Sequence, residues 1–191
     1  MRSSHGETWL GLTLLAGALA PAPPVIAADY LTAEAAQRAL FPEADTFTPV
    51  AVALDAAARQ RVLALAGPQP RHGTLGVWAA RRGDVLVGHV LVDEVLGRVD
   101  LITYAAGIDT AGRLRTPEIL SYRESHGGEI RAGGWRRQFA GRDALGALRP
   151  GRDIRNIAGA TLSCEHVTQG IRWLLALWQA ALRPADGTPG R

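Results

Sequence analysis

The 191-residue sequence contains a single cysteine, Cys164, and no lysine. One cysteine excludes an internal disulfide framework, and it also excludes zinc fingers and c-type haem attachment, because both require paired cysteines. All 21 basic residues are arginine, and they form no basic run interleaved with aromatic residues. We therefore expect no nucleic-acid partner, and we expect stability to come from packing.

The sequence also lacks an uninterrupted apolar run of about 18 residues, which argues against a protein with several membrane spans. Hydrophobic residues make up 47% of the chain and charged residues 20%, and the mean hydropathy is +0.02. These proportions are those of an ordinary globular protein, and they exclude a disordered tail protein. The chain length suits one domain with a modest core.

The N-terminal residues have the pattern of a secretory signal peptide. Arg2 precedes an apolar stretch, Trp9–Ala20, and the small residues after it predict cleavage after Ala27, with cleavage after Ala28 as a close alternative. An uncleaved anchor is the other interpretation, but this apolar core is short for a span of about twenty residues. The sequence thus predicts that residues 1–27 are a cleaved signal peptide and that the mature protein is periplasmic or otherwise extracytoplasmic.

Helices are predicted near both ends of the mature chain. Leu31–Phe41 contains Thr32 as a candidate N-cap followed by strong helix formers, and Ala56–Ala66 is helical in composition up to Gly67. The last helix is predicted from about Ser163 to Leu182, where apolar residues recur at three- and four-residue steps.

Between these helices the sequence predicts consecutive antiparallel strands joined by tight turns. The expected strands are Leu75–Ala80, Val85–Val95, Val99–Ala105 and Leu114–Tyr122. Both faces of the second strand are apolar, which predicts a central strand covered on both sides, with His89 in or beside the core as a structural residue.

The predicted fold class is α+β. Residues 28–182 are expected to form a single domain, an antiparallel meander sheet with flanking N-terminal and C-terminal helices. Residues 183–191 are expected to be a disordered tail.

Two polar, glycine-rich segments are not required by core packing. The first contains Glu124, Ser125, His126, Gly127 and Gly128, and the second contains Gly159, Ala160, Thr161, Leu162 and Ser163 directly before the last helix. The unpaired N–H groups and positive dipole end of that helix would stabilise a phosphate beside the two hydroxyls of the second segment. The alternative is that either hydroxyl serves only as an N-cap.

Both segments resemble motifs of the FMN-binding domain family. This family includes the periplasmic flavin subunits of the sodium-pumping NADH:quinone oxidoreductase and of the Rnf complexes, as well as small secreted FMN-binding proteins. The run Ala-Gly-Ala-Thr-Leu-Ser over 158–163 is similar to the family's S/T-G-A-T signature. The segment 124–130, followed by Trp135 and Phe139-Ala-Gly, resembles its Glu-Thr-Pro-Gly loop followed by Trp and Phe-x-Gly. The similarity covers roughly residues 75–182.

The resemblance implies that FMN is attached through its phosphate to the hydroxyl of Thr161 by a separate flavin transferase that uses FAD as donor. It implies an electron carrier that works with a membrane redox partner and turns over no substrate itself. The bare glycines of the first segment would let the flavin ring approach, with Glu124, Ser125 and His126 available to its polar edge. A tight turn that needs glycine for backbone reasons alone is the alternative.

The sequence departs from the family pattern in two places. Ala158 stands where a Ser or Thr usually lies, and Arg155 replaces the usual Asp, although Asp153 lies two residues upstream. Arg155 could instead contact a flavin phosphate, whether FMN is linked or merely bound. A binding or docking module of the same fold without flavin is the alternative function. A flavin-dependent reductase is a third, although the sequence has no Rossmann-type glycine fingerprint.

Two further features of the sequence leave alternatives open. Cys164 lies in the first turn of the last helix, where the dipole would lower its pKa if it were exposed, whereas burial would make it a small apolar residue. A metal site built from Glu124, His126, Glu129 and His166 would match no tight ligand spacing, so no metal is expected.

Overall fold

The computed structural model describes residues 28–68, 75–146 and 148–184. The predicted signal peptide and residues 185–191 of the predicted tail lie outside the described residues. In chain order the elements are β1 (Ala28–Asp29), α1 (Ala33–Leu40), β2 (Thr46–Pro49), α2 (Ala56–Ala66), β3 (Gly76–Arg82), β4 (Val85–Leu96), β5 (Leu101–Asp109), β6 (Glu118–Tyr122), α3 (Gly133–Arg136) and α4 (Thr161–Leu177), with 3-10 turns at Gly128–Arg131 and Arg137–Phe139 and a π-helical turn at Trp178–Leu182.

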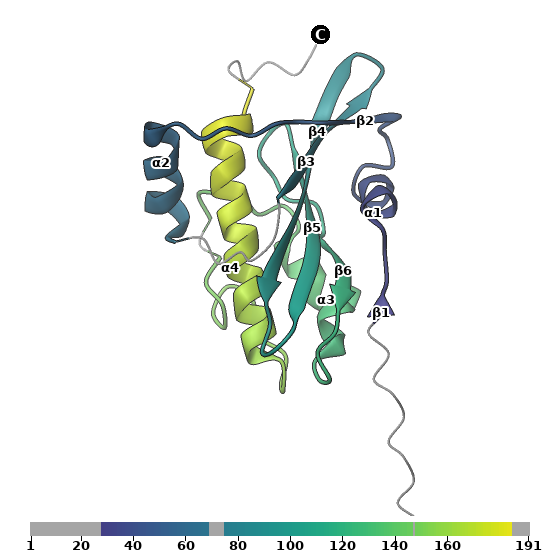
Figure 1. Cartoon of the computed structure of the whole chain (residues 1–191), viewed down its shortest axis with the longest axis vertical. Coiled ribbons are helices and arrows are strands. Elements are labelled where there is room, and N and C mark those ends of the chain that lie inside the picture. Colours follow the sequence, from purple (N-terminus) through teal and green to yellow (C-terminus); the bar gives the residue numbers. More distant parts are fainter. Residues whose placement is uncertain (1–27, 69–74, 147, 185–191) are drawn as a thin grey trace, which may run out of the picture.

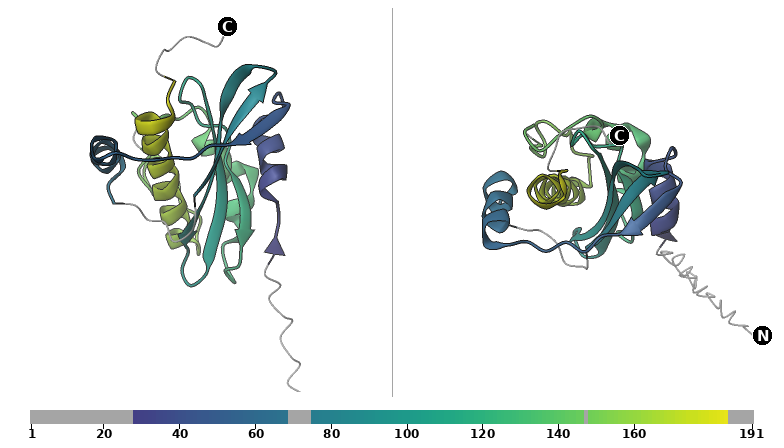
Figure 2. Two further views of the ribbon diagram at one scale, coloured as in Figure 1. Left: turned by 45° about the horizontal axis from the view of Figure 1, so that its top comes forward. Right: turned by 90° about the horizontal axis from the view of Figure 1, so that it is seen from above.

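The strands form one antiparallel sheet with the order β1-β6-β5-β4-β3-β2. Strands β2 to β5 are each paired with the next strand in the chain, and the short β1 pairs with β6 at the far edge. Helices α4 and α2 lie on one side of the sheet and α1 lies on the other (Figure 1), an arrangement also visible from above (Figure 2). The predicted α+β meander with flanking helices is confirmed.

The sequence of strand β4 is apolar on both faces because other elements cover both sides of the strand. Successive side chains of a strand point to opposite sides of the sheet. Accordingly Leu91 packs in the cluster that includes Ile171 of α4, whereas Val90 packs with Leu40 and Phe41 at the end of α1. Each side of the sheet is thus covered by one of the two flanking helices, and the central position predicted for this strand is confirmed.

The helix limits follow from capping residues. Thr32 is the N-cap of α1, and its hydroxyl accepts from the Ala35 N–H at 3.2 Å, as predicted. Helix α2 begins after Asp55, whose carboxylate accepts from the Ala58 N–H at 2.6 Å, and it ends at Gly67 with a φ of 77°. No described helix is both long enough and apolar enough to cross a bilayer.

Three predicted boundaries were wrong. The strand expected from Leu114 begins only at Glu118, because the N–H of Leu114 bonds to the carbonyl of Arg142 in a distant loop. The strand expected from Val99 begins at Leu101, because the preceding residues form the turn between β4 and β5. Helix α4 begins at Thr161, two residues earlier than expected.

Candidate functional site

The two glycine-rich segments meet at one end of the sheet and line an open cavity of about 720 Å³. The turn between β4 and β5, the loop after β6 and the start of α4 all lie at this end of the molecule (Figure 1). The cavity is lined by Arg98, Val99, Glu124, Ser125, His126, Gly159, Ala160, Thr161, Leu162 and Ser163.

Gly127 brings the two segments into contact. Its φ of 83° is in the left-handed region, and a Cβ atom added there would overlap the side chain of Ala160 and lie 2.7 Å from the Tyr122 hydroxyl. Both observations require glycine at this position. Glycine is thus required at position 127 by the backbone conformation and by the close approach of Ala160, and Gly127 itself does not line the cavity. Gly128 does not line the cavity.

The hydroxyl of Tyr122, at the end of β6, joins the same two segments. It donates to the carbonyl of His126 at 2.5 Å and lies 3.3 Å from the Ser163 Oγ. Burial raises the pKa of Tyr122 above its usual value, so the phenol is protonated at neutral pH. The loop after β6 and the first turn of α4 are consequently held in one relative position.

Thr161 is the first residue of α4, and its side chain is exposed at the cavity. The N-cap is Ala160, without a side-chain capping bond, so the interpretation of Thr161 or Ser163 as an N-cap was wrong. The first helical hydrogen bond runs from the N–H of Cys164 to the carbonyl of Ala160. The N–H groups of the preceding residues, including Leu162, therefore have no acceptor within the helix.

Ser163 differs from Thr161 in accessibility. It is only 3% exposed, and its hydroxyl lies beside that of Tyr122. Of the two hydroxyls in the motif, Thr161 alone is open to a large ligand.

The polar residues of the first segment divide into two groups. Ser125 and His126 line the cavity and are joined to each other by a hydrogen bond of 3.0 Å. Glu124 also lines the cavity, but its Oε1 accepts from the backbone N–H groups of Val99 and Asp100 at 2.7 and 3.1 Å. This oxygen holds the β4–β5 turn, a role that the sequence analysis did not foresee.

The sequence analysis missed Arg98 and Val99. Both lie in the β4–β5 turn and reach the cavity only through the fold, and Val99 was expected in a strand. Val99 is 69% exposed and Leu162 is 47% exposed, so two large aliphatic side chains face the cavity.

Arg155 does not line the cavity. Its backbone is held elsewhere, because its N–H donates to the Gln138 side chain at 2.9 Å and its carbonyl accepts from the Trp135 indole at 2.8 Å. Trp135, a residue of the motif, and the neighbouring Gln138 thus fix the chain that leads toward Thr161.

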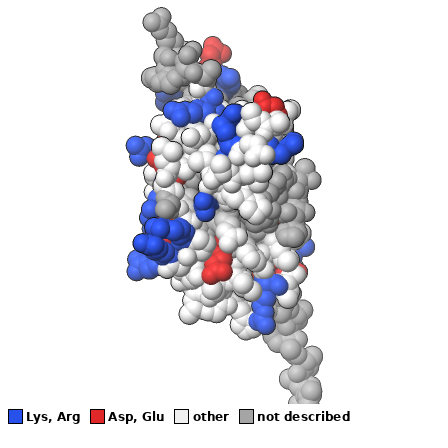
Figure 3. Space-filling model, turned by 90° about the vertical axis from the view of Figure 1, so that its left-hand side faces the viewer, with Lys and Arg blue, Asp and Glu red and all other residues white. Residues whose placement is uncertain are grey.

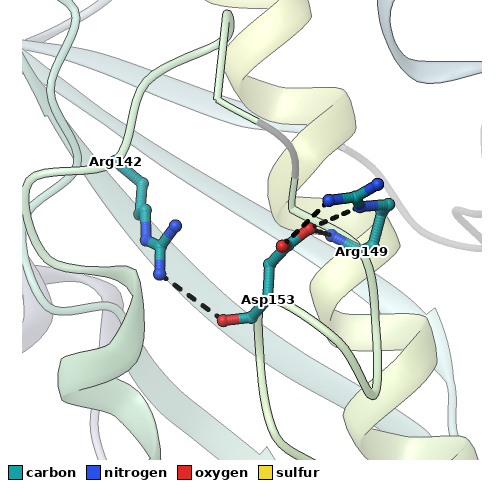
Figure 4. Close-up of polar contacts among 3 residues, drawn as sticks. All are labelled: Arg142, Arg149 and Asp153. Carbon is teal, nitrogen blue, oxygen red and sulfur yellow. Dashed lines mark hydrogen bonds and ion pairs between the residues drawn. The ribbon is translucent and has the colours of Figure 1, made fainter.

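Asp153, two residues upstream, belongs to a separate polar cluster (Figure 4). Arg149 forms two side-chain hydrogen bonds and one backbone hydrogen bond to its carboxylate at 2.8 to 3.2 Å, and Arg142 donates to its carbonyl at 3.4 Å. The hydrogen bonds from Arg149 lower the pKa of Asp153 to about 2. This carboxylate stabilises its own loop and does not reach the cavity.

The alternatives for Cys164 and His89 are settled by burial. Cys164 has no exposed surface, and desolvation raises the pKa of its thiol, so the interpretation as a small buried residue is confirmed. His89 is 6% exposed, and its Nδ1 accepts from the Trp178 indole at 3.2 Å. Burial lowers the pKa of His89, which is therefore the structural residue that was predicted.

Within the part of the chain that the structure describes, no group of three or more His, Cys, Asp or Glu side chains could hold a metal ion. His166, one of the residues weighed for such a site, instead has its Nδ1 2.5 Å from the Leu96 carbonyl. On the face that carries α2, arginines lie in separate groups with acidic residues among them (Figure 3). The absence of metal and nucleic-acid partners stays a prediction.

Compared with known proteins, the sequence matches no family model and no curated protein. The resemblance to FMN-binding domains therefore rests on the two sequence motifs alone.

Proposed function

We propose that the protein is an exported flavoprotein that carries electrons through FMN attached by a phosphoester to Thr161. The observation that carries this proposal is the position of the Thr161 hydroxyl, exposed at the start of α4 beside a cavity of about 720 Å³. Sites for cofactors of this size commonly have volumes of about 300–1,000 Å³. The cavity is thus large enough for a flavin.

The lining residues fit the two chemically different parts of FMN. The phosphate would lie near the first turn of α4, where unpaired N–H groups and the helix dipole favour an anion. Val99 and Leu162 offer aliphatic surface to the tricyclic ring, and Ser125 and His126 offer polar groups to its edge. When bound, FMN would supply the electron-accepting and electron-donating chemistry that no side chain of the cavity has.

Attachment requires only an accessible hydroxyl from this chain. In the transferase reaction, the Thr161 Oγ would bond to the FMN-side phosphorus of FAD, the pyrophosphate bond would break and AMP would leave with that bond's electron pair. The hydroxyl proton would pass to a base of the transferase or to water. The proposal thus assigns no catalytic residue to the chain, and its partners are a flavin transferase during maturation and a membrane redox protein afterwards.

Co-expression with a flavin transferase in an exporting host tests the proposal. We expect a yellow protein whose band fluoresces on a denaturing gel and whose intact mass includes FMN. Thr161→Ala should abolish the adduct, whereas the matched control Ser163→Ala should retain it because that hydroxyl is buried. Survival of the adduct in Thr161→Ala would show that the acceptor is assigned wrongly.

A specific observation also supports the alternative, a docking module without flavin. Neither Ala158 nor Arg155 matches the family motif, and Arg155 does not line the cavity. A wild-type protein that stays colourless and unmodified after exposure to both FMN and the transferase would favour this alternative. Steady-state oxidation of NADH by purified holoprotein would instead indicate a reductase.

A further inference from the structure

Among the residues that the structure describes, Arg98 is the one arginine that lines the cavity. It lies in the turn between β4 and β5, its side chain is exposed, and it has no hydrogen-bond or ion-pair partner among the described residues. The other charged residue of the lining, Glu124, is already engaged with backbone N–H groups. The cavity lining therefore contains an arginine that forms no ion pair or hydrogen bond with Glu124 or with any other described residue.

The backbone of the turn that carries Arg98 is held by hydrogen bonds within the turn and by hydrogen bonds from two other elements. The turn is closed by a hydrogen bond of 2.8 Å from the Gly97 N–H to the Asp100 carbonyl. Glu124 holds the turn from the loop after β6, and His166 holds it from α4 through the Leu96 carbonyl. When Arg98 binds a ligand, only its side chain would consequently have to become ordered, because its backbone is already fixed. This lowers the entropic cost of binding.

We propose that Arg98 binds the phosphate group of the flavin in this cavity and that Glu124 is a positioning residue for it. This inference rests on the proposed function. The phosphate is the anionic part of FMN, and a guanidinium group forms charge-assisted, often bidentate hydrogen bonds to phosphate oxygens. Arg98 thus takes the role that the sequence analysis considered for Arg155, and it makes the cavity selective for FMN over riboflavin.

Binding of free flavins to the full processed chain, isolated from a host without transferase, measures this selectivity. FMN and riboflavin would each be titrated while flavin fluorescence is followed. We expect Arg98→Gln to weaken FMN binding about tenfold, the lower end for a charged hydrogen bond, and to leave riboflavin binding unchanged. Raised ionic strength should weaken FMN binding by the wild type more than by this variant.

Arg82 provides the matched control. It is an exposed arginine at the β3–β4 turn, which lies at the opposite end of β4 from Arg98. Arg82→Gln removes the same charge from the protein but at a distance from the cavity. It should therefore change neither the affinity for FMN nor the affinity for riboflavin. An equal loss in both variants would indicate a general effect of net charge and would overturn the role of Arg98.

Glu124 is tested by a pair of substitutions. Glu124→Ala removes the acceptor for the N–H groups of Val99 and Asp100, and it should lower the ratio of FMN affinity to riboflavin affinity. Glu124→Gln keeps an acceptor oxygen and removes a negative charge from the lining, so it should retain or raise the ratio. In a protein that already carries Arg98→Gln, Glu124→Ala should not lower the ratio of FMN affinity to riboflavin affinity any further, because Glu124 acts on the ratio through Arg98. A further loss in the double variant would overturn the positioning role.

The failures of the two proposals are distinguishable. Flavin binding or attachment by the wild type together with an unchanged FMN-to-riboflavin ratio in Arg98→Gln would overturn this inference and leave the proposed function standing. If the wild type neither binds nor becomes linked to any flavin, both proposals are overturned.

Discussion

Gly127 is the residue on which the shape of the cavity depends most directly, and Gly127→Ala is the substitution that tests this. Its backbone is in the left-handed region with a φ of 83°. An added methyl group would overlap the Ala160 side chain and lie 2.7 Å from the Tyr122 hydroxyl. The substitution therefore strains the backbone and forces apart the two segments that carry the motifs.

The expected loss of stability has two contributions. A residue with a Cβ in the left-handed conformation costs about 1–2 kcal/mol. Overpacking by one methyl group costs typically about 1–3 kcal/mol, and Ala160 and Tyr122 are both buried and have little room to move. We expect Gly127→Ala to lower the free energy of unfolding by about 2–5 kcal/mol.

Urea denaturation followed by circular dichroism measures this loss, and Gly141→Ala is the matched control. Gly141 has a φ of 76°, but apart from Gly141 and its two chain neighbours no described residue has an atom within 4 Å of the position of an added Cβ. Its substitution should cost only the backbone contribution of about 1–2 kcal/mol. Adding Ala160→Gly to Gly127→Ala removes one overlapping group and should restore part of the lost stability.

The result that refutes this reasoning is equal destabilisation by Gly127→Ala and Gly141→Ala. Contact with Ala160 would then contribute nothing beyond the backbone conformation. Failure of Ala160→Gly to restore any stability would refute it as well.

Two further predictions concern buried titratable groups. The pKa of His89 is lowered in the folded protein, so the unfolded chain binds more protons than the folded one as the pH falls below about 6.5. The contribution of His89 to the free energy of unfolding should therefore be fully present above that pH and decrease below it. His89→Gln should remove this part of the pH dependence in denaturation curves. Cys164 is fully buried with a raised pKa, so an alkylating reagent should modify it only in urea, and rapid modification of the native protein would contradict its observed burial.

The helices and strands could be predicted from the sequence wherever apolar residues recur at regular intervals along the chain. The uninterrupted apolar run of β4 indicated a strand covered on both faces, and Val90 and Leu91 do pack on opposite sides of the sheet. Boundaries were less predictable where a distant group decides them. The hydroxyl of Ser163 suggested the start of the last helix, but the helix begins at Thr161 and the Ser163 hydroxyl lies buried beside Tyr122.

The site was predictable only as far as its residues are contiguous in the sequence. Thr161 and His126 belong to two short motifs, and the structure brings both motifs to one cavity. Arg98 could not have been found in this way, because a single arginine in a turn carries no local signal. The turn that carries it is held by Glu124, whose carboxylate reaches across from the loop after β6.

The hydrogen bonds of the polar groups around the cavity also show which of these groups remain available to a ligand. The Tyr122 hydroxyl and the Glu124 Oε1 are satisfied by the protein itself, and the Ser125 hydroxyl and the His126 Nδ1 are bonded to each other. Among the described residues of the lining, the Thr161 hydroxyl and the Arg98 guanidinium have no such partners. A nucleophilic oxygen and a cation left unpaired around one cavity match the two requirements for holding a flavin phosphate, an acceptor for the ester bond and a charge to neutralise the anion.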